Sequence, residues 1–315
     1  MQEVDLISRI ISNIEKVIIG KKHEINNILK GIIANGHILI EDVPGVGKTT
    51  IVKALAKSLN LSYSRIQFTP DLLPSDITGI SIYNQKTMEF EFRKGPVFAN
   101  IVLADEINRT SPKTQSALLE VMEENQVSEG NNTYELNQPF FVLATQNPIE
   151  HEGTFVLPAA QLDRFMIKVK IGYPDKENEC RILELYRNEE PLEDLNSVID
   201  KDEILMLQKK VREVYVSKEI NGYIVDIATA TRKDKNIILG VSPRAALALL
   251  RISQATALIN ERNYVIPEDV KENVLLTLSH RIIISSLARA NNYNNDDVIS
   301  EIISKIFVPR VKYDC

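Results

Sequence analysis

Residues 37–50 read H-I-L-I-E-D-V-P-G-V-G-K-T-T, and this stretch organises the rest of the chain. The apolar run at 38–40 predicts a short buried strand, which Pro44, Gly45 and Gly47 then break. Apolar residues at 51, 55 and 59 share one face of a helix that follows directly. Because strand, glycine loop and helix is the context that a phosphate-binding loop requires, the stretch predicts a nucleotide site.

The residue types in this loop suit phosphate chemistry. Gly45 and Gly47 allow backbone N–H groups to turn inward around an anion, and a helix that begins near Lys48 adds its positive dipole end. Lys48 can reach the β- and γ-phosphates, and the Thr49 hydroxyl can ligate Mg²⁺. The loop residues that we expect to contact the nucleotide are Pro44, Gly45, Val46, Gly47, Lys48, Thr49 and Thr50.

Asp42 departs from the strict pattern G-x-x-x-x-G-K-[ST], which has a glycine at this position. A carboxylate aimed at phosphate would repel it, so we expect Asp42 to turn away from the site. The alternative is a glycine loop that only joins a strand to a helix. The sequence P-G-V-G-K-T directly after an apolar strand argues against that alternative.

Composition limits the class of protein. The 315 residues suffice for two domains, and a net charge of -6 does not suggest the basic face of a nucleic-acid binder. Cys180 and Cys315 match no metal or redox spacing, which favours two unpaired thiols in a reducing compartment. The N-terminus lacks the pattern of a signal peptide, and no apolar run reaches membrane-spanning length. These features predict a cytoplasmic protein.

Apolar strands alternate with helices in the first half of the chain, which predicts a parallel sheet. Two further segments look like hairpins, within 69–97 with a turn at 84–87 and within 127–136 with a turn at 130–132. The pattern turns almost wholly helical after G-Y-P-D at 172–175, so we predict an α/β domain at 1–174 and a helical domain at 175–315. The predicted strands lie at 38–40, 63–68, 100–104, 140–145 and 166–171, and the first helices at about 6–17, 22–34 and 112–124.

Polar groups follow two of these strands. Asp105 and Glu106 end the apolar run 101–104, where carboxylates are costly unless they act on a cation or a water. Asp105 is placed to hold Mg²⁺ through water and Glu106 to polarise an attacking water, although two acids can also simply cap a helix. Asn147 follows the strand 140–145 and can hydrogen-bond a γ-phosphate, although an Asn-Pro turn is common by itself.

Two arginines are further candidates. Arg164 ends a short helix just before the last predicted strand. Arg244 follows Ser-Pro at a helix N-terminus, where the helix dipole disfavours a cation unless an anion is near. Taken singly, each arginine is equally typical of a surface salt bridge.

Together these motifs resemble an AAA+ ATPase of the MoxR branch. The most specific stretches are D-E-I-N-R-T-S-P-K-T-Q-S-A-L-L-E-V-M-E-E from 105 and A-T-Q-N-P-I-E-H-E-G-T-F-V-L-P-A-A-Q-L-D-R-F from 144. The resemblance covers about 10–309. It implies a parallel five-stranded P-loop domain with two hairpin inserts, followed by a small all-helical lid domain.

The resemblance also implies roles for individual residues. Lys48 and Thr49 belong to Walker A, Asp105 and Glu106 to Walker B, and Asn147 to sensor 1. Arg164 resembles the arginine finger given to the neighbouring subunit, with Arg109 a weaker candidate at the same interface, and Arg244 resembles sensor 2 on the subunit's own lid. Residues 69–97 match the helix-2 insert and 127–136 the pre-sensor-1 hairpin. The residues expected to flank adenine are Val17, Ile18, Ile19 and Gly20.

For the whole protein, the resemblance implies ATP or ADP and Mg²⁺ as cofactors and a homo-oligomer, a hexameric ring. It further implies ATP-driven remodelling of protein or metal-enzyme clients, with a von Willebrand factor A domain partner.

Two rival functions belong to other classes. One is a nucleotide-sensing scaffold with little turnover, which would need neither Glu106 nor Asn147 nor Arg164. The other is a DNA-translocating ATPase. The two hairpin segments hold few basic residues for a phosphate backbone, namely Lys86, Arg93 and Lys94.

Overall fold

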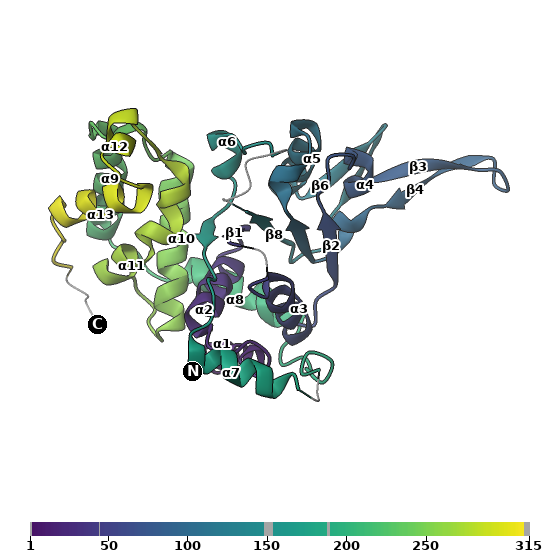
Figure 1. Cartoon of the computed structure of the whole chain (residues 1–315), viewed down its shortest axis with the longest axis horizontal. Helices are drawn as coiled ribbons and strands as arrows, with labels where there is room; N and C mark the ends of the chain where they lie inside the picture. The colour runs from purple at the N-terminus through teal and green to yellow at the C-terminus, as the bar shows by residue number, and fades with distance from the viewer. Residues whose placement is uncertain (1, 44, 148–153, 188–189, 312–315) are drawn as a thin grey trace.

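The computed structural model describes residues 2–43, 45–147, 154–187 and 190–311. Figure 1 shows an α/β part in the centre, a long hairpin that projects from one side of it, and a helical part on the opposite side. Within the described residues, no helix is both long enough and apolar enough to cross a membrane.

The α/β part is built on a five-stranded sheet with the order β2-β5-β8-β1-β9, in which every neighbouring pair is parallel. The predicted parallel five-stranded sheet is therefore confirmed. Ile38 pairs with Leu143 of β8 on one side and with Ile167 of β9 on the other, so β1 is an interior strand. The strands are β1 (Ile38–Glu41), β2 (Tyr63–Gln67), β5 (Ile101–Asp105), β8 (Phe141–Gln146) and β9 (Ile167–Val169).

Both faces of the sheet are covered, which explains why its central strands read as continuous apolar runs. Ile38, Leu103 and Leu143 pack into one core with five helices, while Val102 and Ala144 point to a second core on the opposite face. The helices of the first core are α1 (Gln2–Ile14), α2 (Lys22–Ile33), α3 (Lys48–Ser58), α8 (Lys201–Glu213) and, through Ile252 and Ala255, α10 (Pro243–Ile259), and the second core contains α5 (Pro112–Glu124).

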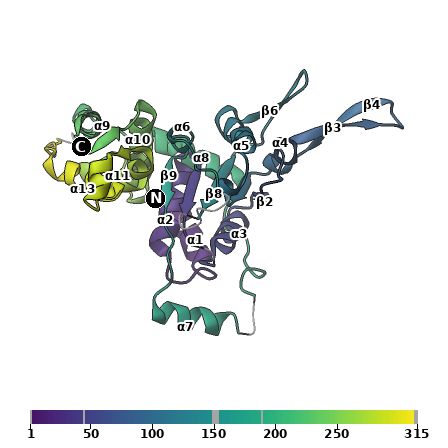
Figure 2. The same cartoon turned by 45° about the horizontal axis from the view of Figure 1, so that its top comes forward.

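The two expected hairpins are present. The short helix α4 (Pro74–Thr78) leads into β3 (Gly79–Asn84) and β4 (Glu89–Lys94), and β6 (Gln126–Glu129) pairs with β7 (Asn132–Glu135). Figure 2 shows both hairpins extending away from the sheet. They touch near their bases, where the rings of Phe92 and Tyr134 stack with centroids 4.2 Å apart.

After β9, the described residues form mostly helices, with a short ladder between β10 (Ile237–Leu239) and β11 (Ile283–Ile284) and one isolated bridge between Tyr215 and Tyr264. Helix α7 (Lys176–Leu185) has no buried residue, and Figure 2 shows it extended along the outside of the α/β part. The lid has a core of its own that begins at Val214. Its helices are α9 (Lys218–Lys233), α10 (Pro243–Ile259), α11 (Pro267–Leu278), α12 (Ser286–Ala290) and α13 (Asn295–Lys305).

Secondary structure and packing therefore change at different points of the chain. The last strand of the sheet ends at Val169, close to the boundary that the sequence predicts at 173–175. Helix α8 still packs with the α/β part through Leu207 and Val211. Ile252 and Ala255 of α10 belong to the same core, so the hydrophobic core does not change at one point of the chain. The domain limits 1–174 and 175–315 stay a prediction. Cys180 is an exposed free thiol, and Cys315 lies outside the described residues.

Candidate nucleotide site

The loop between β1 and α3 has the backbone of an anion site. Gly45 and Gly47 adopt left-handed conformations with φ of 85° and 83°, which favour glycine. Gly47 caps α3, and among the described residues no side chain makes a capping hydrogen bond to the start of this helix. Lys48 donates from Nζ to the carbonyl of Asp42 at 2.9 Å, across the mouth of the loop. Pro44, an expected contact, lies outside the described residues.

Asp42 turns away from this mouth, as its charge requires. One carboxylate oxygen accepts hydrogen bonds from the backbone N–H groups of Ile171, at 2.6 Å, and Gly172, at 2.5 Å. The other accepts from Val43 N–H at 2.8 Å. The carboxylate that replaces the usual glycine thus fastens the start of the loop to the chain just after β9.

A cavity of about 430 Å³ adjoins the loop and brings distant segments together. Val17, Ile18 and Ile19 line it from the N-terminal side, and Leu183 of α7 and Tyr186 just after this helix line it from outside. Its lining also includes Gly45, Val46, Gly47 and Thr50. Gly20 is adjacent, with a φ of 72° and so little space that a Cβ would lie 2.5 Å from Asn178. This apolar cleft beside a phosphate loop has the character of a base pocket.

The carboxyl end of β5 carries the two acids that the sequence singled out, beside the end of β8. Asp105 accepts from the Thr145 hydroxyl at 2.6 Å and forms an ion pair with Arg65 of β2, also at 2.6 Å. Glu106 has a left-handed backbone, with φ 59° and ψ 48°, so its side chain leaves the strand direction. Its Oε2 accepts from Gln67 Nε2 and from Arg109 Nη1, each at 2.9 Å.

The strand register brings these groups to one edge. Gln67 pairs with Asp105 and Glu41 with Gln146, so the phosphate loop, the two acids and Asn147 follow strands that end side by side. Asn147 is buried. Within the part of the chain that the structure describes, there is no cluster of three or more His, Cys, Asp or Glu side chains for a metal ion. The carboxylates at this edge, those of Asp105 and Glu106, fit Mg²⁺ that is bound together with nucleotide. Such Mg²⁺ relies on one or two carboxylates, waters and phosphate oxygens.

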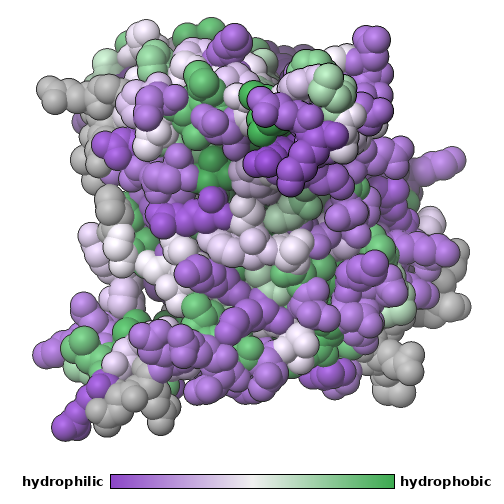
Figure 3. All heavy atoms as spheres, turned by 90° about the vertical axis from the view of Figure 1, so that its right-hand side faces the viewer, coloured by the Kyte–Doolittle hydropathy of each residue, from purple (hydrophilic) through white to green (hydrophobic). Residues whose placement is uncertain are grey.

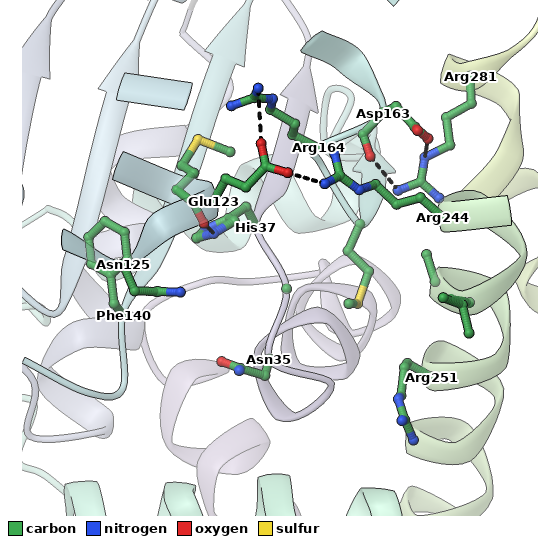
Figure 4. A pocket seen from close by; sticks show the side chains of 15 residues that line it. Asn35, His37, Glu123, Asn125, Phe140, Asp163, Arg164, Arg244, Arg251 and Arg281 are labelled. Atoms are coloured by element: carbon green, nitrogen blue, oxygen red, sulfur yellow. Dashed lines mark hydrogen bonds and ion pairs between the residues drawn. The ribbon is translucent and has the colours of Figure 1, made fainter. Parts of the chain in front are cut away.

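The structure places the two candidate arginines together and apart from this edge. Arg164 donates to the Leu119 carbonyl and pairs with Glu123 at 2.9 Å, and Arg244 of the lid bonds the other oxygen of Glu123 (Figure 4). The hydrogen bond from Arg244 holds the pKa of Glu123 below its usual value. Both arginines line a cavity of about 300 Å³, whereas neither is among the described residues that line the base pocket.

Sequence reasoning missed the partners of these groups. Arg65 and Gln67 sit on β2 directly beside the acids, and Thr145 contacts Asp105 and also the backbone of Glu106. A signal was available, because polar residues at the ends of neighbouring parallel strands must meet at one edge. Glu123 gave no such signal, since it is one of several acids near the end of a helix.

The comparisons with known proteins agree with this geometry. Residues 37–167 match the ATPase family associated with various cellular activities, and residues 229–302 match its AAA lid domain. The fold and the site therefore define a member of the AAA+ ATPases. Chaperone MoxR1 of Mycobacterium tuberculosis is 40% identical over 98% of this chain and 84% of its own length. The chain belongs to the MoxR family.

Two other relatives cover the chain almost completely. An uncharacterised Bacillus subtilis protein, YeaC, is 50% identical over 96% of this chain and 95% of its own. A crystal structure of a protein from Cytophaga hutchinsonii superposes with a TM-score of 0.92 at 43% identity, and covers 98% of this chain and 96% of its own. The lid and both hairpins thus lie within the matched region.

Proposed function

We propose that this chain hydrolyses ATP in the presence of Mg²⁺ as a subunit of a homo-oligomeric ring. The observation that carries the proposal is the division of the site into two places. The uncapped helix end, Lys48 and the two acids gather at one sheet edge, while Arg164 and Arg244 lie in a separate cavity. A single subunit that only stored nucleotide would need neither the acid Glu106 nor the distant arginines.

At the subunit's own site, Lys48 and Thr49 bind and Glu106 does chemistry. When bound, Mg²⁺ offsets phosphate charge, and Thr49 and Asp105 are the residues that would hold it. Lys48 leaves the Asp42 carbonyl to reach phosphate. Glu106 orients and deprotonates the attacking water, for which its Oε2 gives up the bonds from Gln67 and Arg109. Asn147 adds a polar amide at the γ-phosphate.

The arginines act on a neighbouring subunit. The transition state of phosphoryl transfer spreads charge over oxygens that cations stabilise, and an arginine finger is worth about 10³–10⁵ in rate. The side chains of Arg164 and Arg244, which are 29% and 49% exposed, converge on one carboxylate, that of Glu123. None of these three residues is among the described residues that line the base pocket. A neighbour's phosphates would take the place of that carboxylate. On this arrangement Arg244 serves the same interface as Arg164, and not its own nucleotide as the resemblance implied.

The β3–β4 hairpin is the surface that we assign to clients or partners. Met88 and Phe90 near its tip are 71% and 73% exposed, and a two-stranded hairpin is marginal on its own. Figure 3 views the molecule from this side and shows hydrophobic residues scattered among hydrophilic ones. We propose a protein or metal-enzyme client, with a von Willebrand factor A domain partner as the family resemblance implies, and the relative named as a chaperone supports remodelling.

Turnover of purified protein tests the proposal. Lys48→Ala should lose ATP affinity, because Lys48 offsets phosphate charge in the ground state as well as in the transition state. Glu106→Gln should bind ATP normally and hydrolyse it very slowly. Lys53→Ala and Glu124→Gln, which change exposed residues of α3 and α5, are matched controls that should behave like the wild type.

Other outcomes would favour the rivals. Wild-type protein that binds ATP without turnover would point to the nucleotide-sensing scaffold. Turnover that rises with added DNA would point to a translocase. Normal hydrolysis by Glu106→Gln would remove our assignment of the base.

A further inference from the structure

The backbone on either side of Arg164 is fastened to the lid. Asp163 and Phe165 flank this arginine, and both bond residues that come from the lid more than 70 positions later. Figure 4 shows Asp163 facing Arg281 while Arg164 faces Glu123 and Arg244. Arg164, which we assign to the neighbouring subunit's site, therefore lies in a segment, 163–165, that lid residues bond on both sides of it.

Arg281 makes most of these contacts between the lid and the segment 163–165. Its guanidinium pairs with the Asp163 carboxylate at 3.2 Å, and its Nη2 donates to the backbone carbonyls of Asp163, at 3.1 Å, and Phe165, at 2.7 Å. The residue is buried, with 4% of its surface exposed. Burial lowers the pKa of Arg281 to about 10, so the side chain keeps its charge at neutral pH. One planar group thus hydrogen-bonds two carbonyls beside Arg164 and forms an ion pair with the Asp163 carboxylate.

Two further lid residues, Ser242 and His280, also contact the segment 163–165. Ser242 donates from its hydroxyl to the Asp163 carboxylate at 2.8 Å, and it also caps α10, the helix that carries Arg244. His280 lies 3.0 Å from the Phe165 carbonyl through Nε2. Burial and the neighbouring Arg281 charge keep the pKa of His280 well below its usual value, so the neutral ring donates this bond. Arg164 and Arg244 are thereby joined twice, through Glu123 and through Asp163.

We propose that Arg281 is a positioning residue for the trans-acting Arg164, and that through Asp163 it makes the lid of one subunit control catalysis in the next. The inference rests on the proposed function, because it assumes that Arg164 serves a neighbour. Its physical basis is that the segment that carries Arg164 is bonded to the planar guanidinium of Arg281, so Arg164 cannot shift without moving the lid. A lysine ammonium in place of the Arg281 guanidinium cannot contact the Asp163 carboxylate and the two carbonyls in the same geometry.

Two variants of different severity test the inference. Arg281→Lys keeps the positive charge but removes the planar guanidinium. Asp163→Asn keeps an acceptor for the Ser242 hydroxyl but removes the ion pair with Arg281. Asp163→Asn is the gentler change, because 20% of the Asp163 side chain is exposed, and it keeps the test valid if Arg281→Lys does not fold. Arg262→Lys is the matched control, since Arg262 forms a comparable ion pair with Asp269 inside the lid, at 2.6 Å.

The readouts are kcat and KM for ATP, the ATP Kd, and the same values in an Arg164→Ala background. Misplacing a catalytic group by about 1 Å can cost roughly 100-fold, so we expect kcat to fall by about that factor in both variants. The ATP Kd should not change, because the subunit's own pocket is elsewhere. In the Arg164→Ala background neither substitution should lower kcat further, since the effects of substitutions that act through one group are not additive.

The outcomes separate this inference from the proposed function. Unchanged kcat in Arg281→Lys and Asp163→Asn, losses that multiply with the Arg164→Ala loss, or an equal loss in Arg262→Lys would each overturn the positioning role alone. Wild-type turnover in Arg164→Ala by itself would instead overturn the finger, and the positioning role with it.

Discussion

Replacing Asp42 with alanine should destabilise the α/β domain although this residue stands where the general phosphate-loop pattern has no side chain at all. In the structure its carboxylate accepts three backbone N–H bonds, from Val43, Ile171 and Gly172. The Ile171 bond is buried and the other two are partly buried. Asp42→Ala would leave the buried Ile171 donor, and the partly buried Gly172 and Val43 donors, without their side-chain acceptor.

The size of the effect follows from those bonds. A buried donor left unsatisfied costs about 1–3 kcal/mol, so losing the Ile171 and Gly172 bonds should lower the free energy of unfolding by about 3 kcal/mol. Asp42→Asn should cost less, about 1 kcal/mol, because its one carbonyl oxygen can still accept from both donors while its amide faces Val43 N–H.

Urea unfolding followed by far-UV circular dichroism measures these differences. Asp226→Ala, which removes an exposed carboxylate from α9, is the matched control. The expected order of stability is wild type and Asp226→Ala, then Asp42→Asn, then Asp42→Ala. An Asp42→Ala protein that unfolds within about 0.5 kcal/mol of the control would refute the reasoning, because surface changes alone produce differences of that size.

The remaining predictions concern pH and the projecting hairpin. Burial lowers the pKa of His37 from 6.5 to about 4, and its neutral ring bonds both the Met122 carbonyl and Val142 N–H. Because the folded pKa lies below the unfolded one, stability should fall as pH drops from about 6.5 towards 4, by up to about 3 kcal/mol. His37→Gln keeps a donor and an acceptor, so its stability measured over this range should depend less on pH, and an equal dependence would contradict the assignment. Replacing 80–93 by two glycines, which Gly79 and Lys94 can accept because they pair across the hairpin, should spare basal ATP turnover and abolish client remodelling. Lost nucleotide binding in a folded deletion variant would instead make the hairpin part of the site.

The strands and the acids could be predicted from the sequence because local pattern determines them. A buried parallel strand needs a continuous apolar run, and the runs at 38–40 and 101–104 meet that need at both faces of the sheet. Gly45 and Gly47 are likewise local, since each residue's own backbone conformation requires glycine.

The features that escaped prediction depend on long-range packing. Arg281 and Asp163 are 118 positions apart, and no local pattern indicates that they pair. The expected role of Arg244 at its own nucleotide stays a prediction; its contact with Glu123 beside Arg164 depends on the orientation of the lid, which no local pattern indicates. The packing of α8 with the α/β core escaped for the same reason, because a helical stripe shows that a face is buried without showing against what.

The central claim is that the active site is shared between subunits, and mixing two inactive variants tests it most directly. Lys48→Ala protein has an intact Arg164 but cannot bind ATP, and Arg164→Ala protein has an intact phosphate loop but no finger. Once subunit exchange has been shown by a labelled subunit, some interfaces in the mixture join an intact loop to an intact finger. We predict that ATP turnover of the mixture exceeds that of either variant alone. Exchange without any return of activity would contradict a site shared through Arg164.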